Sequence, residues 1–281
     1  MAPQAEAPLK GKIVVVTGAS RGIGKGIALE LGYAGATVYL TGRTTDASPG
    51  AVGSLAETAA QIDAGGGVAI PVRCDHSIDA EVRALLDRVR DEQHGLDLLV
   101  NNVFDSAGFR HTIGVPFWEL DDTVWHDVFD LGTRSAYIAC VHATPLMLES
   151  GGGLIVNISA RGAERYRHNV VYGVGKGAMD RMTRDMAEEL RGHPVSIVSL
   201  WPGTIRTEHL ESIMAAGDRW AIESFGDIDA LETPRYVGRA VVALAADPNV
   251  AMRTGGRYWA AELGRDYAFT DERGRPHDLP E

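Results

Sequence analysis

The 281-residue sequence has little cysteine, no excess of positive charge and no long apolar run. Its two cysteines, Cys74 and Cys140, lie outside any close Cys/His cluster, so we expect reduced core thiols and no metal site. The net charge of −11 argues against nucleic acid or an anionic membrane as a partner. No stretch approaches the roughly 18 apolar residues of a membrane span, and the first residues contain no basic segment followed by an apolar one. We therefore expect a soluble, cytoplasmic protein.

Short β-branched runs alternate with longer amphipathic segments, the pattern of βα units wound into a parallel sheet. The runs are continuously apolar, as expected of strands covered on both faces. The sequence thus predicts a single-domain α/β Rossmann fold with a doubly wound, seven-stranded parallel sheet and helices on both faces. The expected strands are Lys12–Thr17, Thr37–Thr41, Val68–Arg73, Leu96–Asn101, Leu154–Ser159, Val195–Leu200 and Arg257–Ala260, and the expected helices are Gly24–Tyr33, Leu55–Ala64, Asp79–Glu92, Thr123–Glu149, Val171–Arg191 and Pro234–Ala246.

Several segments fall outside this alternation. We expect a flexible N-terminal tail at residues 1–9, one catalytic domain at 10–262 and a polar C-terminal extension at 263–281 that either covers a neighbouring subunit or is mobile. Residues 44–54 are rich in turn formers and follow the second strand. Residues 204–233 are long for a connection, which favours a lid over substrate.

A glycine-rich loop, "TGASRGIGKGIA", follows the first expected strand and leads into a helix. Gly18, Gly22 and Gly24 would let the backbone turn sharply and approach a pyrophosphate, which the helix N-terminus favours. The position between strand and helix is the context that indicates a dinucleotide site. The alternative is a glycine turn that only packs a helix on a sheet.

Charge at the end of the second strand distinguishes the two nicotinamide cofactors, because an acidic residue there binds a ribose 2′-hydroxyl and a basic one a 2′-phosphate. This chain has Arg43 at that point and no carboxylate before Asp46. Arg21, inside the glycine loop, is a second cation near the same place. The pair favours NADP(H) over NAD(H), unless both arginines are simply solvated surface residues.

Further motifs follow in order along the chain: Asp75 after the third strand, "NNVF" from Asn101, Ser159 after the fifth strand, "YGVGK" from Tyr172 to Lys176, and "WPGTIRTE" from Trp201. With the glycine loop, this set resembles the short-chain dehydrogenase/reductase (SDR) family over about residues 10–260. The stretches "FWEL", "YGVGKGA" and "VSLWPGTIRTE" are similar, more narrowly, to its dehydrogenase/reductase member 1 subgroup.

The resemblance implies a catalytic role for Ser159, Tyr172 and Lys176. Tyr172 would be the general acid in reduction and the general base in oxidation, and Lys176 would lower its pKa of about 10 and hold the nicotinamide ribose. Ser159 would hydrogen-bond the substrate oxygen. Singly, each has an ordinary alternative: a helix-surface Tyr/Lys pair and a serine that forms a turn.

The resemblance also implies a set of cofactor contacts. Asp75 matches an aspartate that meets the adenine edge, although a helix N-cap is an equal alternative. Asn101 matches a residue that supports the sheet near the cofactor, and Thr207 one that binds the nicotinamide carboxamide. The full set expected to bind the cofactor is Gly18, Ser20, Arg21, Gly22, Ile23, Gly24, Arg43, Asp75, Asn101, Tyr172, Lys176, Pro202, Gly203, Ile205 and Thr207.

Two positions depart from the family pattern. Phe104 stands where a glycine is usual, and would form a pocket wall or belong to the core. Asp130 stands where the family has an asparagine that links the catalytic lysine to solvent through its backbone and an ordered water. We expect Asp130 to take that catalytic position and its charge to stabilise Lys176 as an ammonium ion, shifting the pH profile.

Three glycines, Gly173, Gly175 and Gly177, surround Tyr172 and Lys176 in the expected helix, although each costs roughly 1 kcal/mol relative to alanine. Their missing side chains would let the cofactor, a neighbouring helix or a partner subunit approach closely. In the family this helix commonly packs against its symmetry mate, which implies a homodimer or homotetramer.

The sequence therefore favours an NADP(H)-dependent oxidoreductase that reduces a ketone or aldehyde to an alcohol. Oxidation of a secondary alcohol or sugar is an alternative, as is a non-catalytic protein that senses NADP(H). A mostly apolar pocket would suit a medium-sized carbonyl compound. Its candidate residues are Phe104, Arg161, Tyr166, His168, Trp201, Ile213, Met214 and Trp220.

Overall fold

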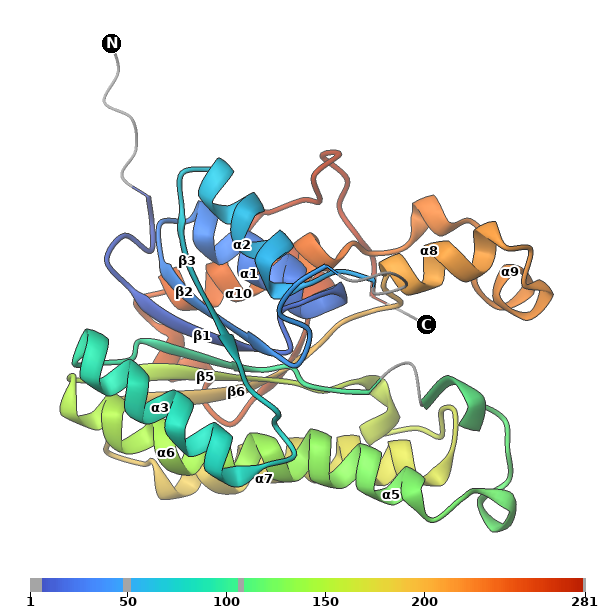
Figure 1. The fold of residues 1–281 in the computed structure, drawn as a ribbon, viewed down its shortest axis with the longest axis horizontal. Coiled ribbons are helices and arrows are strands. Elements are labelled where there is room, and N and C mark those ends of the chain that lie inside the picture. Colours follow the sequence, from blue (N-terminus) through green and yellow to red (C-terminus); the bar gives the residue numbers. More distant parts are fainter. Residues whose placement is uncertain (1–6, 48–51, 106–108, 280–281) are drawn as a thin grey trace. The chain divides into compact units, whose positions relative to one another are not determined.

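A computed structural model describes residues 7–47, 52–105 and 109–279 (Figure 1). Seven parallel strands form one sheet in the order β3-β2-β1-β4-β5-β6-β7. The predicted fold class, an α/β Rossmann-type sheet of seven parallel strands, is confirmed. By its internal contacts the chain divides into two compact units, each built from separate stretches, so residues far apart in sequence share a unit.

The first unit comprises Met1–Arg73, Pro202–Asp247 and Ala260–Glu281. In its part of the sheet, Val15 of the first strand lies opposite Tyr39 of the second, and Leu40 of the second lies opposite Pro71 of the third. A capping box starts α2: the Ser54 hydroxyl accepts from the Glu57 N–H, and the Glu57 carboxylate accepts from the Ser54 N–H. The elements are β1 (Ile13–Thr17), α1 (Gly22–Tyr33), β2 (Thr37–Gly42), α2 (Leu55–Ala64), β3 (Val68–Arg73), α8 (Glu208–Ala215), α9 (Arg219–Phe225), α10 (Pro234–Ala246) and α11 (Ala260–Asp266).

The second unit comprises Cys74–Trp201 and Pro248–Trp259. Its strands β4 and β5 are buried along nearly their whole length, and β6 throughout, which explains why they read as unbroken apolar runs. Helices α6 and α7 both pack on β5 and β6, and α3 packs against α6. The elements are α3 (Asp79–Gln93), β4 (Leu98–Asn101), α5 (Thr123–Val128), α6 (Ser135–Glu149), β5 (Gly153–Ile158), α7 (Val170–Glu189), β6 (Val195–Trp201) and β7 (Arg257–Trp259).

The prediction of a single helix over Thr123–Glu149 is wrong. The structure interrupts it with a π-helical turn, Phe129–Arg134, between α5 and α6. Gly132 weakens the helix at this point, and the Ser135 hydroxyl donates to the carbonyl oxygen of Leu131 at 2.5 Å. Such turns occur often at functional sites.

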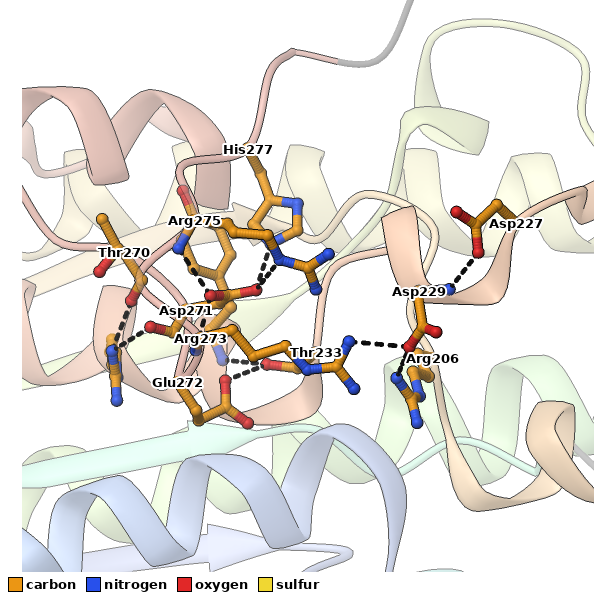
Figure 2. A network of polar contacts seen from close by, with 12 residues as sticks. Arg206, Asp227, Asp229, Thr233, Thr270, Asp271, Glu272, Arg273, Arg275 and His277 are labelled. Atoms are coloured by element: carbon orange, nitrogen blue, oxygen red, sulfur yellow. Dashed lines mark hydrogen bonds and ion pairs between the residues drawn. The ribbon is translucent and has the colours of Figure 1, made fainter.

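The described part of the C-terminal extension packs on its own chain (Figure 2). Asp271 is 1% exposed, and its carboxylate accepts from the N–H groups of Arg273 and Arg275 at 2.8 Å. Arg239, on α10, donates to the carbonyl oxygen of Asp271 at 2.8 Å. The described part of the extension therefore packs on this chain's own first unit, which is neither of the two alternatives from the sequence, a cover on a neighbouring subunit or a mobile tail.

The predicted domain boundaries stay predictions. Residues 1–6 of the expected tail lie outside the described residues, while Leu9, next to the predicted boundary, is buried and its N–H donates to the carbonyl oxygen of Ala34. The expected lid, residues 204–233, contains α8 and α9. Within the part of the chain that the structure describes, no helix has both the length and the apolar composition needed to cross a membrane.

The glycines of α7 let neighbouring segments of the second unit approach its backbone. A Cβ on Gly175 would lie 2.4 Å from Val128 of α5, and one on Gly173 3.2 Å from the carbonyl oxygen of Gly162. A Cβ on Gly177 would make only an ordinary contact, 3.6 Å from the carbonyl oxygen of Ala163. Gly175 is therefore the position where close packing requires glycine.

We predict opposite effects of alanine at two glycines two residues apart on this helix. Gly175→Ala should lower the free energy of unfolding by about 1–3 kcal/mol, because the new methyl overlaps Val128. Gly177→Ala should leave it unchanged or raise it by up to about 1 kcal/mol, because alanine is the better helix former. Chemical denaturation of both variants provides the measurement, and equal losses would contradict the packing argument.

Candidate active site

Three of the four predicted catalytic residues, Ser159, Tyr172 and Lys176, lie where β5 ends and α7 begins. The side chain of Asn169 caps α7 by accepting from the N–H of Tyr172 at 2.9 Å, which places Tyr172 in the first turn and Lys176 one turn later. Lys176 Nζ donates to the carbonyl oxygen of Ile158 at 3.1 Å. The hydroxyl of Ser159, the next residue, donates to the carbonyl oxygen of Lys176 at 3.2 Å. Two hydrogen bonds in opposite directions thus link the strand end to the helix.

The ring of Tyr172 is enclosed by aromatic side chains. Phe109 and His168 each lie 5.0 Å from it, and Phe104 lies 6.0 Å away, measured between ring centroids. On another side the ring leaves no room for a side chain on Gly162, whose Cβ would lie 2.4 Å from it. Tyr172 is 9% exposed as a result.

Because of this enclosure, the pKa of Tyr172 shifts in the direction opposite to the one expected from the sequence. Burial raises the pKa of Tyr172 to about 12, and the cation that opposes this rise is Arg167 rather than Lys176. The lowering by Lys176 expected from the sequence is therefore not what the structure shows. Tyr172 is a neutral phenol at physiological pH and can act as a proton donor.

Burial acts on Lys176 in the opposite sense and lowers its pKa to about 8. The charge of Asp180, one turn further along α7, raises that pKa and so opposes the shift. The ring of Phe104 lies 5.1 Å from Lys176 Nζ, within cation–π distance. Phe104 is therefore part of the site, in contact with both Lys176 and Tyr172.

Asp130 does not have the electrostatic role expected of it. Its carboxylate contacts His126 Nδ1 at 2.7 Å, near the surface, and the carboxylate that raises the pKa of Lys176 is that of Asp180. Asp130 does lie within the π-helical turn, where Thr133 donates to the carbonyl oxygen of Gly175 at 3.2 Å. A backbone role for Asp130 stays a prediction.

The glycine loop has the backbone conformation that the sequence predicted. Gly18 and Gly22 have φ values of 69° and 56°, in the left-handed region that favours glycine. The first N–H groups of any α-helix have no partner within the helix. The side chain of Arg21, which precedes α1, does not cap them. The N–H of Gly22 instead donates to a carboxylate oxygen of Glu208 at 2.9 Å. The loop therefore already binds an oxyanion, which is the chemistry that a cofactor pyrophosphate requires.

The two arginines expected to select NADP(H) lie close together in the first unit. Arg43 directly follows β2, and the guanidinium of Arg21 donates to the hydroxyl of Thr44 at 3.0 Å. A cation from the glycine loop is thus fixed at the end of β2, next to Arg43.

Asp75 and Asn101 both make structural hydrogen bonds. Asp75 accepts from the N–H of Ser77 at 3.1 Å and from its hydroxyl at 2.7 Å, whereas the N-cap of α3 is Ile78, so Asp75 forms a turn rather than capping the helix. Asn101 is buried on β4 and donates to Asn157 of β5 at 2.8 Å. It supports the sheet as the resemblance implied, and the cofactor contacts of both residues stay predictions.

The turn after β6 is held by a residue that the sequence analysis missed. Glu232 is 5% exposed, and its carboxylate accepts from the N–H of Gly203 at 3.0 Å. A Cβ on Gly203 would lie 2.6 Å from that carboxylate, so glycine is required there. Burial raises the pKa of Glu232 to about 7. Thr207, expected to bind the carboxamide, caps α8 by accepting from the N–H of Leu210 at 3.3 Å.

The expected pocket residues divide into two groups. Phe104 and His168 lie against Tyr172, and His168 has a left-handed backbone, with φ of 65°. Trp201 is wrong as a pocket residue, because it is fully buried in β6 and donates to Asp180 at 3.1 Å. The other expected pocket residues, Arg161, Tyr166, Ile213, Met214 and Trp220, stay predictions.

The sequence analysis missed Phe109, Asp180, Glu208 and Glu232. Asp180 had a usable signal, since it lies four residues after Lys176 on the same helix face. The carboxylates of Glu208 and Glu232 meet backbone groups distant in sequence, which no local pattern reveals. Within the described ranges, no group of three or more His, Cys, Asp or Glu side chains is placed to hold a metal ion.

We predict that Lys176 titrates near pH 8, because burial lowers its pKa and the charge of Asp180, not that of Asp130, opposes this shift. Asp180→Asn removes the charge that favours the ammonium form, so the pKa should fall, while the amide oxygen can still accept from Trp201. Asp130→Asn is the matched control and should leave the pKa unchanged. The pKa of Lys176 in each variant is measured from the pH dependence of its acetylation, followed by mass spectrometry. A larger shift in the Asp130 variant would restore the interpretation from the sequence.

Comparison with known proteins agrees with this geometry. The family model for short chain dehydrogenases matches residues 12–217. Dehydrogenase/reductase SDR family member 1 from Mus musculus is 44% identical over 276 residues, which cover 96% of this chain and 86% of the mouse protein.

Solved structures share the fold at lower identity. A 7α-hydroxysteroid dehydrogenase in complex with NADH and 7-oxo glycochenodeoxycholic acid is 26% identical, with a TM-score of 0.76 over 92% of this chain and 96% of the other. A metagenomic short-chain oxidoreductase in complex with NADP is also 26% identical, with a TM-score of 0.71 over 90% and 97%. With the matched family model and the 44% identical relative, these similarities show that the chain belongs to the short-chain dehydrogenase/reductase family.

Proposed function

We propose that this protein is an NADP(H)-dependent oxidoreductase that reduces a ketone or aldehyde to an alcohol. The observation that carries the proposal is Tyr172, a buried phenol kept protonated at neutral pH, whose ring contacts the same Phe104 that lies against Lys176 Nζ. Reduction of a carbonyl group needs a proton donor at the oxygen as negative charge develops there. Membership of the short-chain dehydrogenase/reductase family supports the same class of reaction.

Each residue of the site has a separate task in this reaction. When bound, NADPH supplies the hydride that reaches the carbonyl carbon. When substrate is bound, the Ser159 hydroxyl turns from the carbonyl oxygen of Lys176 and donates its one hydrogen to the carbonyl oxygen of the substrate, and Tyr172 gives that oxygen its proton. The phenolate left on Tyr172 is costly in a buried site, where Arg167 is the cation that favours it, so a proton must return to it from solvent.

The protonated form of Tyr172 is the one from which reduction starts, and a pKa of about 12 maintains that form at neutral pH. Oxidation of a secondary alcohol or sugar, the alternative, starts from the phenolate. The aromatic enclosure by Phe104, Phe109 and His168 supports an apolar carbonyl substrate.

The preference for NADP(H) rests on Arg21 and Arg43 at the end of β2. Two guanidinium groups there favour a 2′-phosphate over a bare 2′-hydroxyl. Within the first unit, the proposed roles are pyrophosphate cradle for the glycine loop, carboxamide contact for the turn Pro202–Thr207 and substrate lid for residues 204–233. Gly22 already binds an oxyanion in that cradle.

We further propose a homodimer or homotetramer in the cytoplasm. Apolar side chains stand exposed on two helices of the second unit: Tyr137 and Val141 on α6 are 50% and 43% exposed, and Val170 and Val174 on α7 are 46% and 48% exposed. Contact with a second copy would cover them. Light scattering gives the mass in solution.

The first test is NADPH oxidation with a panel of ketones and aldehydes, for the wild type, Tyr172→Phe and Tyr33→Phe. We expect turnover that Tyr172→Phe lowers by about 10²–10⁴-fold, because it removes the proton donor. Tyr33, which is 39% exposed at the end of α1, is the matched control, and its variant should keep full activity. NADPH binding without turnover on any carbonyl or alcohol would favour a non-catalytic NADP(H) sensor instead.

Arg43→Asp tests the cofactor preference. The variant should bind NADPH about 10–100-fold more weakly and NADH little changed, because the lost contact is a charge-assisted one to the 2′-phosphate. Arg88→Asp, on the exposed face of α3, is the control for a change of surface charge. Equal losses for NADPH and NADH in Arg43→Asp would remove the argument for NADP(H).

A further inference from the structure

The position expected to receive the cofactor pyrophosphate is bound by a side chain of this protein. The N–H of Gly22, at the start of α1, donates to Glu208 at 2.9 Å, although 186 residues separate them in sequence. Glu208 is the first residue of α8, at the beginning of the proposed lid. Thr207, the residue before Glu208, also lies near Gly22, because a Cβ on Gly22 would be 3.7 Å from the Thr207 methyl group.

This contact satisfies an ordinary physical need of the helix. The first N–H groups of a helix have no partner within it, and its dipole favours an anion there. Arg21, at the N-cap of α1, makes no capping hydrogen bond with its side chain. The carboxylate of Glu208 therefore takes the place of both a cap and a bound anion.

The base of the lid is held by different contacts. The guanidinium of Arg206 forms ion pairs with Asp229 and Glu211, and Arg273 of the C-terminal extension pairs with the same Asp229 at 2.7 Å. The N–H of Arg206 also donates to the carbonyl oxygen of Glu232 at 2.8 Å. Figure 2 shows Arg206 and Arg273 pointing at Asp229 from two segments.

The end of the lid is tied in the same way. Thr233 donates to Glu272 of the C-terminal extension at 2.6 Å, which Figure 2 also shows. Both ends of residues 204–233 are thus fastened within the first unit by contacts that involve no glycine-loop atom. Glu208 is the lid residue whose carboxylate meets that loop.

We propose that Glu208 is an internal substitute for the cofactor pyrophosphate, which must displace it in order to bind. Two anions cannot share the N–H of Gly22 without strong repulsion. Cofactor binding would then release the start of α8 and move it about the fixed base at Arg206. The inference rests on the proposed function, because it takes the glycine loop as the site of a nicotinamide dinucleotide.

Reciprocity follows from this competition. If the dinucleotide weakens the Glu208–Gly22 contact, the contact weakens dinucleotide binding by the same factor. The position of the lid is thereby coupled to the presence of the cofactor, and a substrate would meet a differently placed α8 before and after cofactor binding.

Binding measurements on two variants test the proposal. Glu208→Gln removes the charge and keeps an acceptor, and Glu208→Ala removes both. Titration by NADPH fluorescence should give a Kd about 2–10-fold lower for both variants than for the wild type. Glu188→Gln, at an exposed carboxylate of α7 paired with Arg191, is the matched control and should not change the Kd.

A probe without a pyrophosphate separates this effect from general electrostatics. Adenosine 2′-monophosphate should bind the wild type and the Glu208 variants with equal affinity. Hydrogen exchange of residues 209–215 in the cofactor-free protein should be faster in Glu208→Ala than in the wild type, because α8 loses its contact with the loop.

The outcomes are distinct. NADPH binding that is equal or weaker in both Glu208 variants overturns the inference and leaves the proposed function intact. A gain that is as large for adenosine 2′-monophosphate also overturns it, since the effect is then one of overall charge. A wild type that binds neither NADPH nor NADH overturns the proposed function, and the inference fails with it.

Discussion

The hydrogen bond from the Lys176 amino group to the carbonyl oxygen of Ile158 is the contact on which the candidate site depends. An ammonium ion removed from water must be compensated by oxygen atoms, π electrons or a carboxylate. Ile158, Phe104 and Asp180 supply one of each. Because the Ser159 hydroxyl returns a hydrogen bond to the carbonyl oxygen of Lys176, the end of β5 and the first two turns of α7 cannot shift independently.

Much of this arrangement could be predicted from the sequence because its causes are local. Alternation of apolar strands with amphipathic segments gave the parallel sheet, and strand ends agreed with the structure to within two residues. The four-residue spacing of Tyr172 and Lys176 placed both on one helix face. The glycines at positions 18 and 22 were identified by the turn they permit, and both have positive φ. Each of these inferences needed information from only a few neighbouring residues.

What the sequence could not predict depends on contacts between distant segments. Nothing near Glu232 indicates that its carboxylate lies against the N–H of Gly203. The pKa of Tyr172 was expected to fall because a lysine is near, yet it rises, since the aromatic wall that includes Phe109 comes from another segment. Trp201 looked like a pocket residue beside a functional turn, but the strand that carries it is fully buried. Burial is a property of the assembled fold, and it decided each of these cases.

The π-helical turn at Phe129–Arg134 makes the length of that segment matter as much as its composition. An α-helix advances about 100° for each residue, and a π turn takes up one residue more than an α turn. The extra residue is thus absorbed within the turn, and α6 keeps the phase in which Ala139 and Ala143 are buried. Removing one residue would let the segment close as an ordinary α-helix and would take away the wide turn from which Thr133 donates to Gly175. The cost of such a deletion would therefore fall on the contact with α7 rather than on the packing of α6.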